Sequence, residues 1–393
     1  MGGAIERHRK GISATVEILQ QNRPTTGFGT RSRILRWQTN CGGASRAFLL
    51  EFLQACSRIY LFTQIAPSPN AASEACDSSA SPGISAMKRL FLTGHDGFVG
   101  RTLRARLAAK NGDARDYEVV LPSGQYDLRD QPSIERAIAG EQLDCVIHLA
   151  AQSFVPESFR DPRQTLEVNF IGTLNLLQAL QRSAFRGRLL YVSSAEVYGL
   201  VQVSEMPIDE ARPARPRSPY GVSKVAAEAL CEQWSQTEGL DVMIARPFNH
   251  IGPGQSERFV ASSFARQLAE IKLGRRDPVI AVGDVDVTRD VTDARDVVNA
   301  YLLLLEQGST AEIYNVCSGR ESWIRDILTT LIELSGVDAR LFQDPAKLRT
   351  TDQQRLLGSF DKLHRRTGWT PAIELRASLR DTLAYWEREL ADG

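Results

Sequence analysis

Three side chains, of Ser194, Tyr220 and Lys224, could together transfer a proton, as their types and their order in the chain indicate. Ser194 follows the apolar run 188–193, and Tyr220 and Lys224 stand four residues apart within a helical pattern at 219–238. Because residues four apart share a helix face, the ammonium should lie beside the phenol and lower its pKa from about 10 toward neutrality. A phenol of that kind could act as a general acid or base, whereas an isolated Tyr-x-x-x-Lys is more often a solvated helix face.

A glycine-rich turn could hold the phosphates of a nucleotide. Gly94, Gly97 and Gly100 follow the apolar run 90–92 at the spacing G-x-x-G-x-x-G, and a helical pattern continues at 101–109. Glycine permits a sharp turn and a close backbone approach, and a helix N-terminus offers N–H groups with the positive end of the dipole. Strand, turn and helix together predict a nucleotide site, although a glycine turn alone would be weak evidence.

A parallel sheet wrapped by helices would bring these residues together, since apolar runs alternate with helical patterns from Lys88 onward. The expected strands are 90–92, 117–121, 145–151, 188–193 and 241–246, and the expected helices are 101–109, 131–140, 161–182 and 219–238. Ligands bind at the carboxyl ends of strands in such sheets, so Ser194 should face the nucleotide. Farther on, we expect helices at 259–273 and 291–307 and a strand at 313–318.

Composition excludes several classes of function. The chain has 393 residues with 47 basic and 47 acidic side chains, so no net charge favours nucleic acid or an anionic membrane. Six scattered cysteines without a C-x-x-C pair are typical of reduced thiols, so we expect a cytoplasmic protein. Five isolated histidines predict no metal centre, and no run approaches the roughly 20 apolar residues of a membrane span.

Residues 1–87 differ from the rest, because they are rich in Arg and Ser, poor in acids, and rich in Pro, Ala and Ser at 67–85. We expect a disordered extension, with one amphipathic helix near 47–66 as the alternative. Met87 stands directly before the first strand, so the functional chain could begin there.

The order of these motifs resembles the extended short-chain dehydrogenase/reductases that act on nucleotide sugars. The matching segments are T-G-x-x-G-x-x-G at 93–100, Asp127-Leu128, H-L-A-A at 148–151, 168–177, 246–255 and T-G-W-T-P at 367–371. The resemblance implies an α/β fold: a doubly wound parallel Rossmann sheet at 88–246 and a smaller C-terminal α/β substrate lobe at 247–393. Segments near 289–318 would return to the main sheet.

The resemblance also implies roles for individual residues. Ser194 would hydrogen-bond a ketone oxygen, Tyr220 would deliver a proton, and Lys224 would hold the nicotinamide ribose, with Glu196 close by. The implied cofactor contacts, besides Tyr220 and Lys224, are Gly94, Gly97, Phe98, Val99, Gly100, Arg101, Asp127, Leu128, Leu149, Ala150 and Ala151. The expected substrate contacts are Ser153, Phe154, Glu157, Asn249 and Gln255, together with Arg289 and Arg349, whose guanidinium groups suit a diphosphate.

The sequence favours NADPH as the cofactor. NAD sites commonly place an acid after the second strand to bind the ribose 2′-hydroxyl, and residues 121–126 contain none. Arg101 directly follows the last motif glycine and could bind a 2′-phosphate. NAD remains an alternative, with Arg101 then an ordinary exposed helix residue.

The implied reaction is reduction of the C4 ketone of GDP-4-dehydro-6-deoxy-D-mannose to GDP-D-rhamnose. The alternatives are a GDP-mannose 4,6-dehydratase, in which Glu196 would act as a base, a nucleotide-sugar 4-epimerase, and a nucleotide-binding regulator without catalysis. Ala195 departs from the Ser or Asp common in the dehydratases and disfavours that alternative. The resemblance further implies a homodimer formed through the helices 162–182 and 219–238, with neither a nucleic-acid nor a membrane partner.

Overall fold

The computed structural model describes residues 87–109, 117–122, 124–347 and 353–392. The expectations for residues 1–86, a disordered extension or one amphipathic helix, lie outside the described residues, as does Arg349. None of the described helices is long and apolar enough to cross a membrane.

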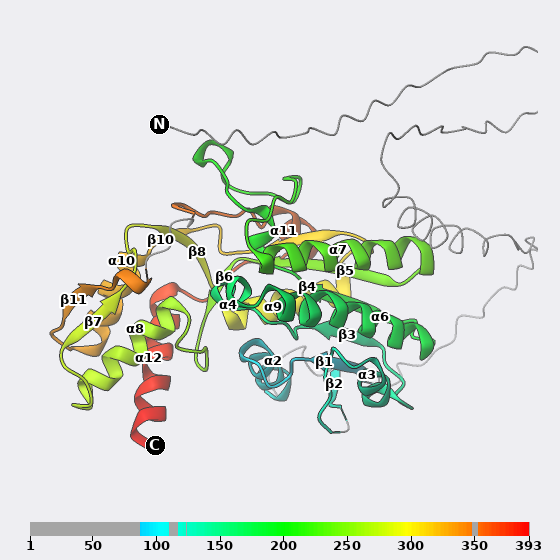
Figure 1. Cartoon of the computed structure of the whole chain (residues 1–393), viewed down its shortest axis with the longest axis horizontal. Helices are drawn as coiled ribbons and strands as arrows, with labels where there is room; N and C mark the ends of the chain where they lie inside the picture. The colour runs from blue at the N-terminus through cyan, green and yellow to red at the C-terminus, as the bar shows by residue number, and fades with distance from the viewer. Residues whose placement is uncertain (1–86, 110–116, 123, 348–352, 393) are drawn as a thin grey trace, which may run out of the picture. The chain divides into compact units, whose positions relative to one another are not determined.

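A parallel sheet of six strands forms the centre of the fold, in the order β2-β1-β3-β4-β5-β9 (Figure 1). The strands are β1 (Lys88–Thr93), β2 (Tyr117–Val120), β3 (Cys145–His148), β4 (Arg188–Val192), β5 (Asp241–Pro247) and β9 (Ile313–Val316). They are nearly continuous apolar runs because helices cover both faces. The strand order reverses between β1 and β3. Doubly wound sheets of this Rossmann type bind ligands at such a reversal, in the crevice outside the carboxyl ends of the strands.

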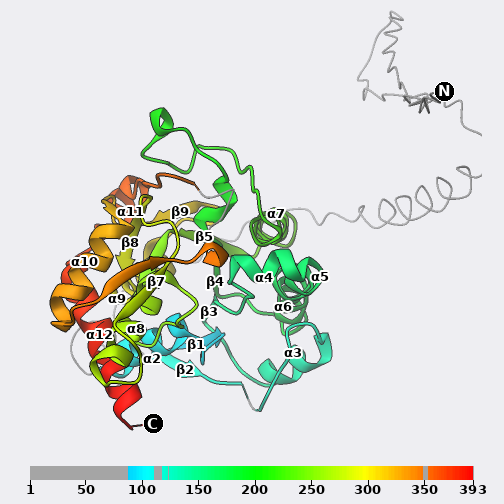
Figure 2. The ribbon, with the colours of Figure 1, turned by 60° about the vertical axis from the view of Figure 1, so that its left-hand side comes forward.

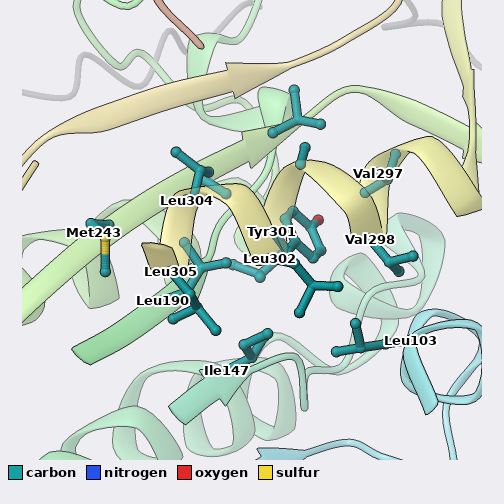
Figure 3. Close-up of a cluster of buried hydrophobic side chains, with 14 of the residues drawn as sticks. Leu103, Ile147, Leu190, Met243, Val297, Val298, Tyr301, Leu302, Leu304 and Leu305 are labelled. Atoms are coloured by element: carbon teal, nitrogen blue, oxygen red, sulfur yellow. The ribbon is translucent and has the colours of Figure 1, made fainter. Parts of the chain in front are cut away.

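Two helical layers cover the sheet. On one face lie α2 (Phe98–Ala108) and α9 (Ala294–Gln307), and on the other lie α3 (Gln131–Ile138), α6 (Gly172–Arg182) and α7 (Pro219–Glu238). Figure 3 shows how α9 packs on the sheet, with Tyr301, Leu302 and Leu305 near Leu190 of β4 and Ile147 of β3. These side chains are almost wholly buried, and each contributes about 1.5–3 kcal/mol by leaving water.

The helix expected at 161–182 is interrupted. The chain forms α4 (Val155–Arg160), α5 (Pro162–Leu166), a π-helical turn η2 (Glu167–Ile171) and then α6. Asp161 caps α5 by accepting a hydrogen bond from the Gln164 amide at 2.9 Å. The π turn adds a residue to the helical repeat and places Asn169 inward, where it is buried.

The C-terminal part contains two small sheets, β10-β8-β6 and β11-β7. Their strands are β6 (Asn249–Ile251), β7 (Val279–Val282), β8 (Thr288–Asp293), β10 (Glu321–Trp323) and β11 (Arg340–Gln343). The helices α8 (Val260–Lys272), α10 (Ile324–Ser335) and α12 (Leu375–Asp392) enclose a separate apolar core. Figure 2 shows β7 and β8, one strand of each sheet, near α8 and α10. The short elements η3 (Ala195–Tyr198), η4 (Val203–Glu205), η5 (Pro345–Lys347) and α11 (Asp361–Thr367) complete the described fold.

The helix expected at 291–307 begins three residues later. Residues 291–293 continue β8, and Asp293 caps α9 by accepting a hydrogen bond from the Arg295 amide at 2.8 Å. The strand expected at 313–318 does return to the main sheet, where β9 pairs with β5. The buried carboxylate of Asp290 joins these parts, since it accepts hydrogen bonds from the amides of Ser318, Gly319 and Gly358.

Candidate active site

The glycine turn lies at the carboxyl end of β1, against the segment that follows β3. Gly94 has a φ of +69°, and a Cβ there would come within 2.8 Å of the Ala150 nitrogen, so only glycine fits. The N-cap of α2 is Gly97, and no side chain caps the first turn. The N–H groups that begin α2 therefore face outward from the turn, and these residues fit a dinucleotide phosphate.

A buried polar network holds this turn in place. The Thr93 hydroxyl lies 2.7 Å from Nδ1 of His148 and accepts a hydrogen bond from the Ala150 amide at 3.2 Å. The other ring nitrogen of His148 lies 3.0 Å from the hydroxyl of Thr173. Burial, with a smaller effect of Lys224, lowers the pKa of His148 to about 3, so the ring is neutral. The network ties β1, β3 and α6 together beneath the turn.

Ser194, Tyr220 and Lys224 meet at the carboxyl end of β4. Ser194 is the N-cap of η3, accepting a hydrogen bond from the Glu196 amide at 3.2 Å, and its hydroxyl is close enough to Tyr220 to influence the pKa of the phenol. The Lys224 ammonium donates to the Val192 carbonyl at 2.8 Å and lies 6.0 Å from the centre of the Tyr220 ring. Both Tyr220 and Lys224 are buried.

The pKa of Tyr220 differs from the sequence-based expectation. Burial raises the pKa of this phenol to about 12, opposed by the hydrogen bond from Ser194 and assisted by the charge of Glu196. Lys224 does not lower it as expected, because the ammonium is directed at a backbone carbonyl rather than at the phenolic oxygen. Burial lowers the pKa of Lys224 itself to about 8. At neutral pH the phenol therefore carries its proton and the ammonium remains mostly charged.

Asn169, on the π turn, positions the helix that carries Tyr220. Its side-chain amide donates to the Gln152 carbonyl at 3.0 Å and to the Ser223 hydroxyl at 2.9 Å, and Ser223 donates to the Tyr220 carbonyl at 2.7 Å. Its oxygen accepts from the Gln152 amide at 2.8 Å. One side chain thus links the loop after β3 to the first turn of α7.

A cavity of about 680 Å³ extends from this site into the C-terminal part of the fold. Glu196, beside Ser194, contributes to its wall. The expected substrate residues among its lining are Ser153, Phe154, Asn249, Gln255 and Arg289. The sequence therefore identified side chains from four separate segments that the fold brings to one cavity.

Gln255 has an unusual environment within this lining. Its side chain is buried, and its nitrogen donates to the His250 carbonyl at 2.7 Å. Its Oε1 is also buried and accepts no hydrogen bond from the described residues. A buried acceptor without a donor is costly, and a hydroxyl or N–H of a ligand would satisfy it.

Other expected contacts lie elsewhere or are already bonded. Glu157 is outside the cavity lining and pairs with Arg160 at 2.8 Å. The Asp127 carboxylate pairs with Arg129 at 2.6 Å. Leu128 is buried, and its side chain lies where a Cβ on Gly172 would meet it.

Arg101 lies at the edge of the glycine turn. Its guanidinium donates to the Asp96 carbonyl within the turn and to the Gly254 carbonyl at 3.0 Å. Phe98, at the start of α2, stacks on His250 with ring centres 6.0 Å apart. These contacts connect the turn to the segment that carries Gln255.

Several residues of the site were not found from the sequence. The Tyr126 hydroxyl accepts a hydrogen bond from the Gly94 amide at 3.3 Å, and the lining of the cavity includes His250, Arg258, Asp284 and Lys347. The sequence does show that such residues lie in loops after strands. It does not show which of these loops the tertiary fold brings to the site. Among the described residues, no group of His, Cys, Asp or Glu side chains could hold a metal ion.

The chain is similar to several known proteins of one family. The family model described as GDP-mannose 4,6 dehydratase matches residues 92–382. A GDP-6-deoxy-D-mannose reductase of Pseudomonas aeruginosa is 48% identical over 306 residues, which cover 78% of this chain and 99% of that protein. A GDP-mannose 4,6-dehydratase of Vibrio cholerae serotype O1 is 30% identical over 303 residues, covering 69% of this chain and 80% of that protein.

Among solved structures, RMD from Pseudomonas aeruginosa complexed with NADPH is similar to this chain with a TM-score of 0.73 and 47% identity. The match covers 77% of this chain and 100% of that one.

Proposed function

This chain belongs to the GDP-mannose 4,6 dehydratase family, and we propose that within it the chain is the reductase that converts GDP-4-dehydro-6-deoxy-D-mannose to GDP-D-rhamnose with NADPH. The main support is that Ser194, Tyr220 and Lys224 meet at the carboxyl end of β4, and that Glu196, whose amide bonds Ser194, lines a cavity large enough for a nucleotide sugar. The 48% identity extends over nearly the whole length of a GDP-6-deoxy-D-mannose reductase.

Ser194, Tyr220 and Lys224 would each have a separate role in the reaction. Ser194 holds the ketone oxygen, and Tyr220 donates a proton to that oxygen as it becomes an alkoxide. Lys224 places a positive charge behind the phenol and binds the ribose beside it. Bound NADPH supplies the hydride that reaches C4.

The environment of Tyr220 suits the role of a proton donor. A general acid must carry its proton at the start of the step, and the raised pKa of about 12 ensures that it does at neutral pH. A base that removes a proton from an alcohol would instead need a lowered pKa.

A pH profile tests the role of Lys224. We expect kcat/KM for reduction to fall above a pH of about 8, because the ammonium is lost as pH rises through its lowered pKa. Tyr220 keeps its proton throughout this range. The initial rate of NADPH oxidation, measured between about pH 6 and 10, checks this expectation. A profile that stays flat to the alkaline limit would contradict it.

The preference for NADPH rests on two features of the turn. No acid follows β2 among the described residues up to Tyr126, and the Arg101 guanidinium lies beside the turn with its charge available to a phosphate. RMD from Pseudomonas aeruginosa was solved with NADPH, which supports the same choice.

A 4,6-dehydratase is the second candidate, favoured by the position of Glu196. This exposed carboxylate lines the cavity beside Ser194, where it could remove a proton from the sugar. A dehydratase regenerates its nicotinamide in each turnover, whereas a reductase consumes one NADPH per sugar. Net consumption of NADPH with the keto sugar therefore distinguishes the two.

We also propose a homodimer through α4 to α7, because large apolar side chains are exposed on these helices: Phe159, Leu166, Ile171 and Val222. Large apolar side chains exposed on helices that pack together commonly mark an interface. We expect Leu166→Glu with Val222→Glu to yield single chains in analytical ultracentrifugation, whereas the wild type sediments as a dimer. Leu341→Glu, at an equally exposed position on β11, serves as the control. A wild-type protein that sediments as a single chain would refute the dimer.

A cytoplasmic location is the remaining part of the proposal. Cys145, Cys231 and Cys317 are buried free thiols in the described fold, which suits a reducing compartment.

A further inference from the structure

One short segment of the chain contacts the glycine turn's helix and also lines the cavity. Residues 249–255 follow β5, and four of them are among the cavity lining: Asn249, His250, Ile251 and Gln255. The same segment contacts Phe98 and Arg101, which lie in the first turn of α2 directly after the glycine turn. We call residues 249–255 the bridging segment, because they touch both the expected cofactor residues and the expected substrate space.

A stack of two aromatic rings forms the first of these contacts. The rings of Phe98 and His250 lie 6.0 Å apart between their centres, and their planes are 9° from parallel. A Cβ on Gly252 would lie 3.4 Å from the tip of the Phe98 ring, so this ring also packs against the backbone of the bridging segment. Stacked aromatic rings attract each other beyond the area that they bury, so Phe98 and His250 hold each other in position.

The Arg101 guanidinium forms the second contact. It donates a hydrogen bond to the Gly254 carbonyl at 3.0 Å and another to the Asp96 carbonyl in the glycine turn. A guanidinium presents its donors in one rigid plane, so a bond in one direction also sets the direction of the other. One charged group is thus bonded both to the turn and to the bridging segment.

Hydrogen bonds within the bridging segment connect these contacts to the cavity lining. The buried side chain of Gln255 donates to the His250 carbonyl at 2.7 Å, and the Gln255 amide donates to the Gly252 carbonyl at 3.3 Å. The Ser262 hydroxyl of α8 donates to the Gln255 carbonyl at 2.6 Å. Gln255 keeps these bonds only while His250 and Gly252 stay in place, so the contacts with α2 also position Gln255.

The first turn of α2 carries the groups that a bound cofactor would order. The N–H groups at a helix N-terminus have no partner within the helix, and no side chain caps this one at Gly97. A phosphate accepts hydrogen bonds from such groups and fixes the turn that carries Phe98 and Arg101. When one ligand orders an element that a second ligand also requires, the second binds at a lower ordering cost.

We propose that the bridging segment couples the two sites, so that cofactor at the glycine turn strengthens the binding of the nucleotide sugar in the cavity. Phe98 and Arg101 transmit the effect from α2, and His250 is a positioning residue for the cavity lining. Coupling between two binding sites is reciprocal, so the sugar nucleotide strengthens cofactor binding by the same factor. This inference rests on the proposed function, because it takes the turn as the cofactor site and the cavity as the site of a GDP-sugar.

Titration calorimetry of the full chain measures the coupling. GDP-mannose, which has no ketone to reduce, is titrated with and without saturating NADPH, and the ratio of the two dissociation constants is the coupling factor. We expect NADPH to tighten GDP-mannose binding about 5- to 20-fold in wild type, and GDP-mannose to tighten NADPH binding equally. His250→Ala removes the stack and should bring the factor close to one, whereas His250→Phe keeps a ring that can stack and should retain most of it.

The coupling factor is a readout that a merely structural role of His250 would not change. Damage confined to the cavity would weaken GDP-mannose equally with and without NADPH, and the factor would stay as in wild type. Arg101→Met, which loses the bond to Gly254, should also lower the factor. Arg104→Met is the matched control on α2, because Arg104 pairs with Asp96 at 3.3 Å and has no hydrogen bond to the bridging segment among the described residues.

Two results would overturn the inference and leave the proposed function intact. One is a factor of one in a wild-type protein that binds both ligands, and the other is an equal factor in wild type, His250→Ala and Arg101→Met. Failure of the wild type to bind GDP-mannose under either condition would overturn the proposed function as well.

Discussion

Replacing Tyr220 by Phe is expected to lower kcat for ketone reduction about 10²- to 10⁴-fold, the usual contribution of a positioned general acid. The phenol is buried and protonated and lies near Ser194, so it is the group that we propose protonates the reduced oxygen. Phenylalanine preserves the ring and removes only the hydroxyl group that carries that proton. Stopped-flow or steady-state NADPH oxidation measures the effect, and NADPH affinity should change little.

Tyr301→Phe provides the matched control for this experiment. Tyr301 is also fully buried, but it lies on α9 within the apolar core, and its hydroxyl has no partner among the described residues. Removing that hydroxyl should leave kcat within about threefold of wild type, because no step depends on it. If Tyr220→Phe and Tyr301→Phe retained equal activity, Tyr220 would not be the proton donor.

Replacing Glu228 by Ala is expected to lower the free energy of unfolding by about 3–5 kcal/mol, the usual cost of removing one member of a buried ion pair. Glu228 on α7 accepts two hydrogen bonds from the Arg246 guanidinium on β5, at 2.9 and 2.6 Å, and both side chains are buried. Arg246 also lies 4.9 Å from the centre of the Tyr198 ring, and its Nη1 already has no partner among the described residues. Without Glu228, an uncompensated charge would remain buried.

Glu232→Ala is the matched control, one helical turn farther along α7. Glu232 is exposed and accepts a hydrogen bond only from Gln236 on the same helix, so its loss should cost less than about 0.5 kcal/mol. Urea unfolding followed by circular dichroism compares the two variants. A loss below about 1 kcal/mol for Glu228→Ala would contradict the importance assigned to the pair.

The features that the sequence predicted well depend on local patterns. The glycine spacing, the apolar runs of a sheet covered on both faces and the helical pattern at 219–238 predict β1, β5 and α7 from short stretches, and α7 spans the residues expected for it. Motif order then predicted that Ser194, Tyr220 and Lys224 act together, and the fold places them at the carboxyl end of β4. The resemblance to a known family also predicted that the strand at 313–318 returns to the main sheet, where β9 pairs with β5.

The features that the sequence missed depend on tertiary contacts. The π turn at Asn169 exists because that side chain bonds Gln152 and Ser223, which are distant in sequence. The pKa of Tyr220 was predicted in the wrong direction because helical spacing reports proximity to Lys224 but not the depth of burial. Asp284 and Lys347 line the same cavity after the paired strands β7 and β11, and no sequence period shows that pairing.

The most direct measurement is the consumption of NADPH by the purified chain with GDP-4-dehydro-6-deoxy-D-mannose, followed by absorbance together with product analysis. We expect one NADPH to be oxidised for each sugar reduced, with GDP-D-rhamnose as the product and a higher kcat/KM with NADPH than with NADH. Absence of NADPH oxidation, with GDP-mannose instead converted to the keto sugar without net cofactor consumption, would contradict the reductase and favour the dehydratase.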